Sequence, residues 1–388
     1  MSTHYDIVVI GGGINGVGMA QAAAAAGYSV LVLEKTALAA GTSSRSSKLI
    51  HGGLRYIESA RFGLVRESLR ERALLLERAP ELVRLVPFYI PVYRDTRRRP
   101  WQIALGLSLY SLLGGLAPDN RFSRSTRAQW SNPDGLEINN LQCVFRYHDA
   151  QTDDAALTRA VMRSAQALGA ELRVPAEIVT ARRQDNDWDI DYLDGAAAIS
   201  CSAGAIVNAT GPWVNEVLAH VTPLPPRFGV ELVQGTHIVL DAPARDGIYY
   251  VEATDGRAVF VMPWHGRTLI GTTEILFHGD PAGAAPTPQE IEYLQQTYRR
   301  YFPQSPAKLL QSFAGLRVLP ATRGTPFYRS REAVFYPDAP RQPRLITIYG
   351  GKLTSYRITA GRALAALRPA LPARVRRADT ATLMLRPD

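Results

Sequence analysis

The sequence has few cysteines and few lysines. Its two cysteines, Cys143 and Cys201, are too few for a disulfide framework and form no CxxC pair. A cysteine-based metal site is therefore excluded, no metal is expected, and a reducing compartment fits. Only four of the 44 basic residues are lysines, so nearly all of the positive charge is carried by arginine.

Long apolar runs and targeting signals are also scarce. The N-terminus begins as a strand and lacks a basic region followed by an apolar stretch and a cleavage site, so no signal peptide is expected. The one extended apolar segment, residues 101–117, has 17 uncharged residues and follows several arginines, whereas a membrane span needs about 20. Two interpretations stay open: a helix buried in a second domain, or a helix lying in a membrane interface.

Charge and length narrow the class of protein. A hydrophobic fraction of 46% excludes wholesale disorder, and 388 residues suit a large two-domain unit. The net charge of +9 favours anionic partners such as phosphorylated metabolites or anionic lipid. Because zinc-finger spacing and strips of alternating basic and aromatic residues are missing, no nucleic-acid partner is expected.

Hydrophobic periodicity predicts alternating strands and helices. Strands are expected over 5–10, 29–33, 171–174, 204–208, 230–240, 258–263 and 345–349. Helices are expected over 19–26, 62–85 (interrupted by Pro80), 154–169, 288–302 and 355–368. The proline-rich stretch 222–226 is interpreted as a crossing between domains.

A glycine-rich turn between the first strand and the first helix carries the first chemical signal. Gly11, Gly13 and Gly16 have the GxGxxG spacing, and Glu34 lies at the end of the next strand. Such glycines permit a tight turn, close approach of a pyrophosphate and close packing of helix on strand, while the acid accepts ribose hydroxyls and disfavours NADP. The pattern predicts dinucleotide binding but does not separate FAD from NAD.

The next segment, GTSSRSSKLIHGGLRYIE at 41–58, clusters hydroxyls that could bond a pyrophosphate or a flavin. It resembles the FAD-dependent glycerol-3-phosphate dehydrogenases, a branch of the D-amino-acid-oxidase-like flavoproteins. Further similar blocks follow in order: Asp153–Ala155, Asn208–Trp213, Gly235–Val239, Gly271–Thr273, Gly315–Arg317 and Tyr349–Arg357. The resemblance covers roughly residues 5–368.

Two departures from the family pattern stand out. The family's Gly-Thr-Thr-Asp is here Gly-Thr-Thr-Glu274, and the further helical C-terminal domain usual in the family is expected to be absent. Any role of that domain in assembly, membrane docking or electron transfer would then be missing.

The resemblance implies an α/β fold. It has a Rossmann-like FAD-binding domain and an inserted α+β substrate domain built on a mixed, largely antiparallel sheet. The expected division is 1–85, 150–225 and 326–370 for the FAD-binding domain, 86–149 and 226–325 for the substrate domain, and 371–388 for a tail.

The implied activity is oxidation of sn-glycerol 3-phosphate to dihydroxyacetone phosphate by hydride transfer to flavin N5, with electrons passed to a quinone. The implied location is the cytoplasmic side of the inner (plasma) membrane, held peripherally, or else the cytoplasm; a homodimer is possible. Two alternatives stay open: an oxidase or dehydrogenase of the same fold acting on an amino acid or 2-hydroxy acid, and a non-catalytic FAD-binding subunit or sensor.

The resemblance also implies site residues. FAD is expected to bind non-covalently, because neither cysteine lies in a family attachment motif. The cofactor-binding candidates are Gly11, Gly13, Ile14, Asn15, Gly16, Glu34, Thr42, Ser43, Ser44, Ser47, Lys48, Leu49, Ala176, Thr210, Gly211, Gly350, Gly351, Lys352, Leu353 and Thr354. The substrate candidates are Arg55, Tyr56, Thr272, Arg317 and Arg331, because arginine forks suit a phosphate. The catalytic candidates are His237 as the base, with Lys352 and Arg317.

Overall fold

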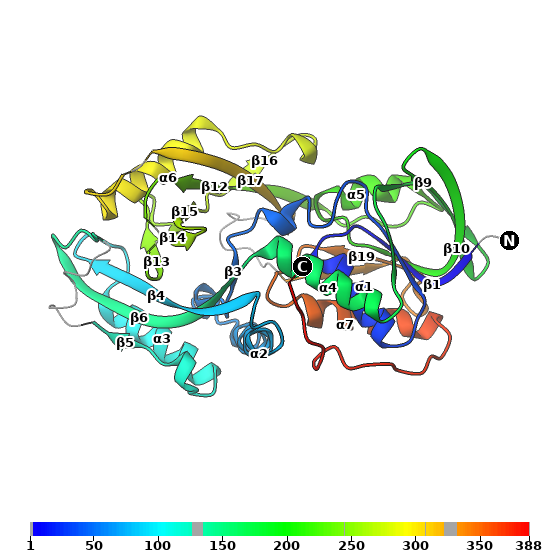
Figure 1. Ribbon diagram of the computed structural model, residues 1–388, viewed down its shortest axis with the longest axis horizontal. Helices are drawn as coiled ribbons and strands as arrows, with labels where there is room; N and C mark the ends of the chain where they lie inside the picture. The colour runs from blue at the N-terminus through cyan, green and yellow to red at the C-terminus, as the bar shows by residue number, and fades with distance from the viewer. Residues whose placement is uncertain (1–2, 126–134, 244, 307, 322–331, 388) are drawn as a thin grey trace.

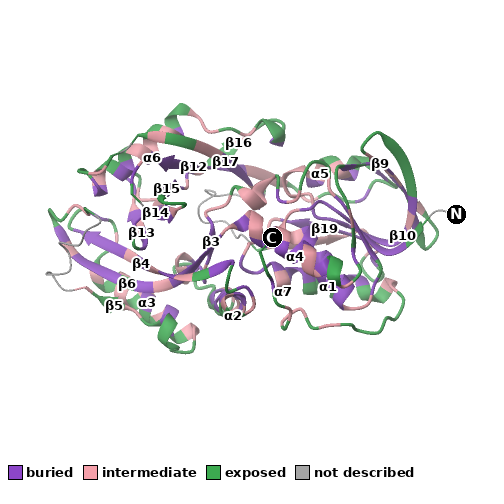
Figure 2. Cartoon of the chain, in the orientation of Figure 1, coloured by how far each residue is buried: buried purple, intermediate pink, exposed green. Residues whose placement is uncertain are grey.

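The chain folds around two large sheets that lie side by side (Figure 1). The computed structural model describes residues 3–125, 135–243, 245–306, 308–321 and 332–387. The first sheet has nine strands and the second has ten. Buried residues are concentrated in the strands of both sheets, whereas the segment that follows the last helix is largely exposed (Figure 2).

The first sheet is parallel at its centre. Its strands are β1 (Thr3–Ile10), β2 (Val30–Leu33), β7 (Glu171–Arg173), β8 (Ala176–Gln184), β9 (Asp187–Asp194), β10 (Ala197–Asn208), β11 (Val221–Thr222), β18 (Val334–Pro337) and β19 (Leu345–Tyr349). Strand β1 pairs in parallel with β2 and β10, and β10 pairs in parallel with β19. An antiparallel extension of β8, β9 and β10 completes it.

Three helices cover one face of this sheet. Helix α1 (Ile14–Ala25) packs against α4 (Asp154–Ala167) and α7 (Tyr356–Leu367). Ten of the twelve α1 residues are buried, which explains why small alanines fill this helix. Helix α2 (Phe62–Arg78) packs against the second sheet, and the short α5 (Val214–Val217) contacts β19.

The second sheet is mixed and mostly antiparallel. Its strands are β3 (Leu49–Ile50), β4 (Val83–Tyr93), β5 (Ser123–Arg124), β6 (Leu141–Thr152), β12 (Val230–Leu240), β13 (Ile248–Glu252), β14 (Ala258–Trp264), β15 (Arg267–Gly271), β16 (Ile275–Phe277) and β17 (Leu309–Pro320). Helix α3 (Pro100–Leu113) packs against β6, and α6 (Pro288–Tyr301) packs against β12. Strand β3 pairs with β6, so the segment that follows the first βαβ unit already crosses to the second sheet.

One sequence-based expectation is wrong. The helix expected over 62–85 ends at Arg78, and residues 83–85 belong to β4. Pro80 cannot continue the backbone hydrogen bonding of a helix, and the alternating apolar residues after it pair with β6 instead. The division into domains stays a prediction, because the sheets themselves do not fix its boundaries.

Helix α3 shows features of both interpretations of residues 101–117. Leu107 and Tyr110 are buried in the core beside β4 and β6, whereas Trp101, Leu105 and Leu112 are 67%, 55% and 61% exposed. One face is therefore core and the other presents large apolar side chains to solvent. No helix among the described residues is long and apolar enough to cross a membrane.

Candidate active site

The glycine turn after β1 has the geometry of a phosphate cradle. Gly11 has a φ of +106°, in the region that favours glycine, and a Cβ at Gly16 would lie 1.9 Å from the Gly11 carbonyl oxygen. These positions therefore exclude any side chain and let α1 begin directly under the strand. The first turn of α1 points its N–H groups at this cradle, and Ile14 N donates to Ser43 Oγ at 2.9 Å.

Glu34 closes the other side of the cradle. Its Oε2 accepts from Gly12 N at 2.7 Å and its Oε1 accepts from Thr36 N at 2.8 Å. The Glu34 carbonyl accepts from Ala176 N at 2.7 Å, which fixes the end of β2 beside the start of β8. The carboxylate thus lies next to the turn, where the sequence pattern expects a ribose to be bound.

The loop after β19 meets the same cradle. Asn15 Nδ2 donates to the Gly350 carbonyl at 2.8 Å, and a Cβ on Gly351 would lie 3.1 Å from the Asn15 amide. Asn15 Oδ1 is buried and has no hydrogen-bond partner among the described residues. A buried acceptor between two glycine-rich loops fits a bound group that donates hydrogen bonds there.

The hydroxyl-rich loop binds the two sheets together. Thr42 Oγ1 donates to the Leu316 carbonyl at 2.6 Å, so this loop lies along β17. His51 N donates to Thr354 Oγ1 at 3.1 Å, which ties the same segment to the loop after β19. At the end of β10, Thr210 Oγ1 donates to Asn208 Oδ1 at 2.7 Å, and Gly211 has a φ of +58°.

Basic side chains gather beyond the glycine loops. Lys352 Nζ lies 3.9 Å from the centre of the Tyr56 ring, and the Arg55 guanidinium carbon lies 5.4 Å from the same ring. Burial lowers the pKa of Arg317. The carboxylate of Glu274 acts in the opposite direction, whereas the positive charge of Arg55 adds to the lowering. Two cations therefore lie against the Tyr56 ring, and Arg317 lies close enough to interact electrostatically with Arg55 and Tyr56, an arrangement suited to a dianion.

Arg317 is held by neighbours on the second sheet. Its Nη1 pairs with Glu274 Oε1 at 2.9 Å and its Nη2 donates to Thr272 Oγ1 at 3.1 Å. A Cβ on Gly235 would lie 2.6 Å from Arg317 Nη2, so glycine is required there to admit the guanidinium. Arg331 lies outside the described residues.

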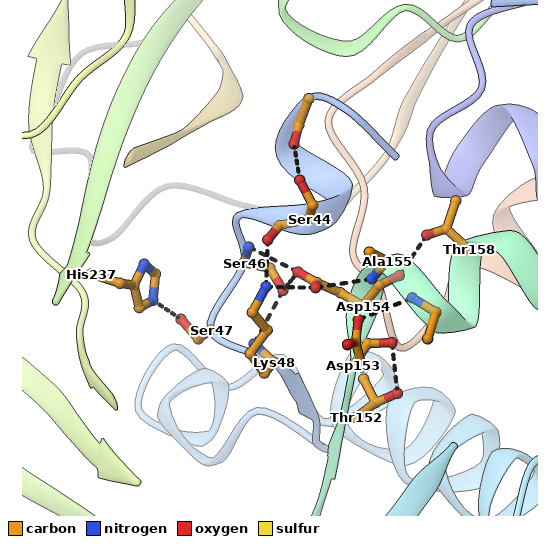
Figure 3. Close-up of polar contacts among 12 residues, drawn as sticks. Ser44, Ser46, Ser47, Lys48, Thr152, Asp153, Asp154, Ala155, Thr158 and His237 are labelled. Atoms are coloured by element: carbon orange, nitrogen blue, oxygen red, sulfur yellow. Dashed lines mark hydrogen bonds and ion pairs between the residues drawn. The ribbon is translucent and has the colours of Figure 1, made fainter. Parts of the chain in front are cut away.

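His237 is buried at the centre of the second sheet. The strand register places it between Gly271 on β15 and Phe313 on β17, and its ring stacks on Phe313 at 5.1 Å and 13°. A Cβ on Gly271 would lie 2.1 Å from His237 Cδ2. Nε2 lies 3.0 Å from Ser47 Oγ, as Figure 3 shows.

The environment of His237 disfavours its charged form. Burial is the largest cause, followed by the positive charges of Arg317 and Lys48, and together they lower the imidazole pKa to about 3. The Gly235 carbonyl acts in the opposite direction but does not offset them. The ring is therefore neutral at physiological pH.

The candidates fall into two groups in space. The glycine loops, Glu34, Ser43 and Asn15 line one region, and Arg55, Tyr56, Arg317, Thr272 and Lys352 form the second. The side chains of Ser47 and Lys48 contact His237 and Asp154, respectively. The roles of all these residues stay predictions. No cluster of His, Cys, Asp or Glu within the described ranges could hold a metal.

Sequence reasoning missed some partners. It noted Glu274 only as a departure from a motif and did not connect it to Arg317, 43 residues away. It also gave no reason for Gly235 and Gly271, each of which precedes a threonine. The structure shows that the absence of a side chain at these positions leaves space for Arg317 and His237, respectively.

Comparison with known proteins identifies the family of this chain. Residues 6–367 match the family model of DAO, described as FAD dependent oxidoreductase. The chain is 40% identical over 373 residues to glycerol-3-phosphate dehydrogenase of Pseudomonas aeruginosa, covering 94% of this chain and 72% of that protein. It is 37% identical to D-erythritol 1-phosphate dehydrogenase of Brucella abortus, covering 95% and 74%.

A solved structure shows the same likeness. The glycerol-3-phosphate dehydrogenase of Bacillus halodurans, complexed with FAD, superposes with a TM-score of 0.73 at 26% identity, covering 98% of this chain and 68% of that one. This chain therefore belongs to the FAD-dependent oxidoreductases of the DAO family. The predicted fold class, an α/β flavoprotein with a mixed second sheet, and the predicted cofactor, FAD, are confirmed.

Proposed function

We propose that this protein oxidises sn-glycerol 3-phosphate to dihydroxyacetone phosphate. The observation that carries the proposal is the group of cations around Tyr56, next to the candidate FAD cradle. The names of the Pseudomonas and Bacillus relatives support the same substrate. Bound FAD would supply the hydride acceptor for the secondary alcohol.

Arg55 and Arg317 are the proposed phosphate ligands, together with Arg331. A planar guanidinium binds phosphate through two parallel hydrogen bonds, and Glu274 and Thr272 hold Arg317 in one orientation. Tyr56 is the proposed hydroxyl partner of the same ligand. The proposed geometry fixes the substrate before reaction, which removes much of the entropic barrier.

His237 is the proposed base for the hydroxyl proton. A neutral imidazole can accept a proton, but a pKa of about 3 makes it a weak base in the absence of substrate. A phosphate dianion beside Arg317 would offset part of the positive field that lowers this pKa. The base would therefore strengthen when substrate binds.

Lys352 and the N-terminus of α7 are proposed to stabilise negative charge on the reduced cofactor. The loop 350–355 joins β19 to this helix and contains Lys352, so the positive end of the helix dipole and the ammonium lie in the same region. We further propose that FAD is held non-covalently. Cys143 and Cys201 are buried in β6 and β10, and acid precipitation should release the flavin into the supernatant.

We propose a quinone as electron acceptor and peripheral attachment to the cytoplasmic face of the inner (plasma) membrane. A quinone dissolves in the bilayer, so the flavin must come within reach of that phase. The exposed apolar face of α3, followed by Leu116 at 54% exposure, lies beside Arg97, Arg98 and Arg99 and supports this proposal. A homodimer stays a prediction.

Substrate comparison tests the proposal. Purified enzyme should show a higher kcat/KM for glycerol 3-phosphate than for glycine, sarcosine or 2-hydroxyglutarate. D-erythritol 1-phosphate belongs in the same panel because the Brucella relative is named for it. Preference for D-erythritol 1-phosphate would support the proposed phosphate site but contradict glycerol 3-phosphate as the substrate. Preference for an unphosphorylated compound would overturn both.

A further inference from the structure

A buried ion pair lies beside the contact between Ser47 and His237 (Figure 3). Lys48 Nζ lies 2.6 Å from Asp154 Oδ1, and the two side chains are 5% and 0% exposed. The same ammonium also donates to the Ser44 carbonyl. Sequence reasoning placed Lys48 among the FAD ligands, but its side chain points to the first residue of α4.

Asp154 fastens the hydroxyl-rich loop to α4 with its second oxygen. Its Oδ2 accepts from Ser46 N at 3.0 Å and from Ser46 Oγ at 2.6 Å. From the other side, the Lys48 carbonyl accepts from Thr152 N at 2.9 Å. The three residues that precede β3 are therefore fixed by one carboxylate and one backbone bond.

These bonds hold a strained turn. Lys48 has a φ of +60°, a left-handed conformation that is unfavourable for an L-residue other than glycine. The reversal turns the side chains of Ser47 and Lys48 in different directions, so that Ser47 meets His237 while Lys48 meets Asp154 (Figure 3). A relaxed backbone at Lys48 would move the Ser47 hydroxyl away from the imidazole.

His237 and Lys48 both lie against the ring of Phe313. The His237 ring stacks on Phe313, and Lys48 Nζ lies 5.3 Å from the centre of the same Phe313 ring and 5.3 Å from that of Trp264. A buried ion pair is a weak source of stability, because removing two charges from water offsets most of their attraction. We therefore assign the Lys48–Asp154 pair a role in fixing the geometry of the turn rather than in stabilising the fold.

We propose that Lys48 and Asp154 are positioning residues for His237: their ion pair fixes the left-handed turn that presents Ser47 Oγ to His237 Nε2, and this contact fixes the orientation of the imidazole. The inference rests on the proposed function, in which His237 is the base. Among the described residues, the charged groups that face His237 are Lys48 from the loop and Arg317 from β17, and each is paired with a carboxylate, that of Asp154 or Glu274.

The test uses the flavin-loaded protein and three changes. Asp154→Asn weakens the pair, Lys48→Met with Asp154→Asn removes both charges while keeping similar shapes, and Ser47→Ala removes the hydroxyl alone. The matched control is Lys35→Met with Glu177→Gln, an exposed pair at 2.7 Å. Flavin content and the urea midpoint establish that each variant is folded.

The ring-nitrogen signals of His237, assigned by their loss in His237→Gln, give a readout that does not depend on turnover. In the wild-type protein they should report one tautomer. In Ser47→Ala and in the charge-removed variant they should move toward values averaged over tautomers, and the control pair should leave them in place. Unchanged signals in both test variants would overturn the inference, whatever the activity.

Kinetics supply the second readout. Ser47→Ala and the charge-removed variant should each lower kcat on glycerol 3-phosphate by about 10- to 100-fold, the range for a misplaced catalytic group, with less than about threefold change in KM. Combined, they should cost little more than either alone, since both act through one contact. Losses that multiply would overturn the inference. Full activity in His237→Gln would instead refute the proposed base, while the nitrogen signals still decide the positioning.

Discussion

Arg317 and Glu274 form an ion pair on the second sheet, with Nη1 2.9 Å from Oε1. Both side chains are largely removed from solvent, at 19% and 7% exposure. The pair orients the guanidinium toward the region of Arg55 and Tyr56, which both contribute to the electrostatic field at Arg317. Glu274, which is longer than the aspartate usual in the family, thus reaches Arg317.

Replacing Arg317 with Ala should lower kcat/KM for glycerol 3-phosphate by about 2–5 kcal/mol in transition-state terms, the range for truncating one partner of a buried charged pair. Flavin content should stay normal. Because the change leaves Glu274 unpaired, it is also made in a Glu274→Gln background. Arg182→Ala, at an exposed pair with Asp191, is the control. Near wild-type kcat/KM in the Arg317 variants would remove this arginine from the substrate site.

Gly16→Ala should abolish flavin binding. Its Cβ would meet the Gly11 carbonyl oxygen at 1.9 Å, so α1 could not begin where the phosphate cradle requires. The matched change is Gly361→Ala on the exposed face of α7, where the new Cβ would meet no described atom within 4 Å beyond the helix itself. That variant should keep its flavin and gain about 0.5–1 kcal/mol in free energy of unfolding. A Gly16 variant that purifies yellow would contradict the assigned cradle.

The buried His237 should make the protein less stable in acid. Its imidazole has a pKa of about 3 in the folded chain and near 6.5 when unfolded, so between these values only the unfolded chain is protonated. The free energy of unfolding should fall as pH drops through this window. In His237→Gln the fall from pH 7 to pH 5, measured by urea unfolding with saturating FAD, should be smaller. An identical fall would show that His237 is not held neutral.

Sedimentation with anionic liposomes tests the exposed face of α3. Changing Leu105 and Leu112 to Ser should release the folded protein, because these side chains face solvent. Leu224→Ser, at a position of similar exposure on another surface, should leave binding intact. Neighbouring arginines add about 1 kcal/mol each, so salt should weaken binding only in part. Equal sedimentation of all variants would place the attachment elsewhere.

Local patterns predicted the parts of the fold that depend on neighbouring residues. Strands β12 and β19 match their expected ranges, and the glycine turn lies where its spacing placed it, since each signal is contained in a few residues. The hairpin of β8 and β9 was not predicted, because its pairing depends on register with β10. Likewise, the ion pair between Lys48 and Asp154 joins residues that are 106 positions apart in the sequence, and no local sequence pattern predicts such a contact.

Anaerobic titration of the purified flavoprotein with glycerol 3-phosphate tests the central claim most directly. The account predicts that the oxidised flavin spectrum bleaches with about one equivalent of substrate per flavin, since each alcohol delivers two electrons. A flavin that stays oxidised with glycerol 3-phosphate, yet bleaches with glycine, sarcosine or 2-hydroxyglutarate, would contradict it.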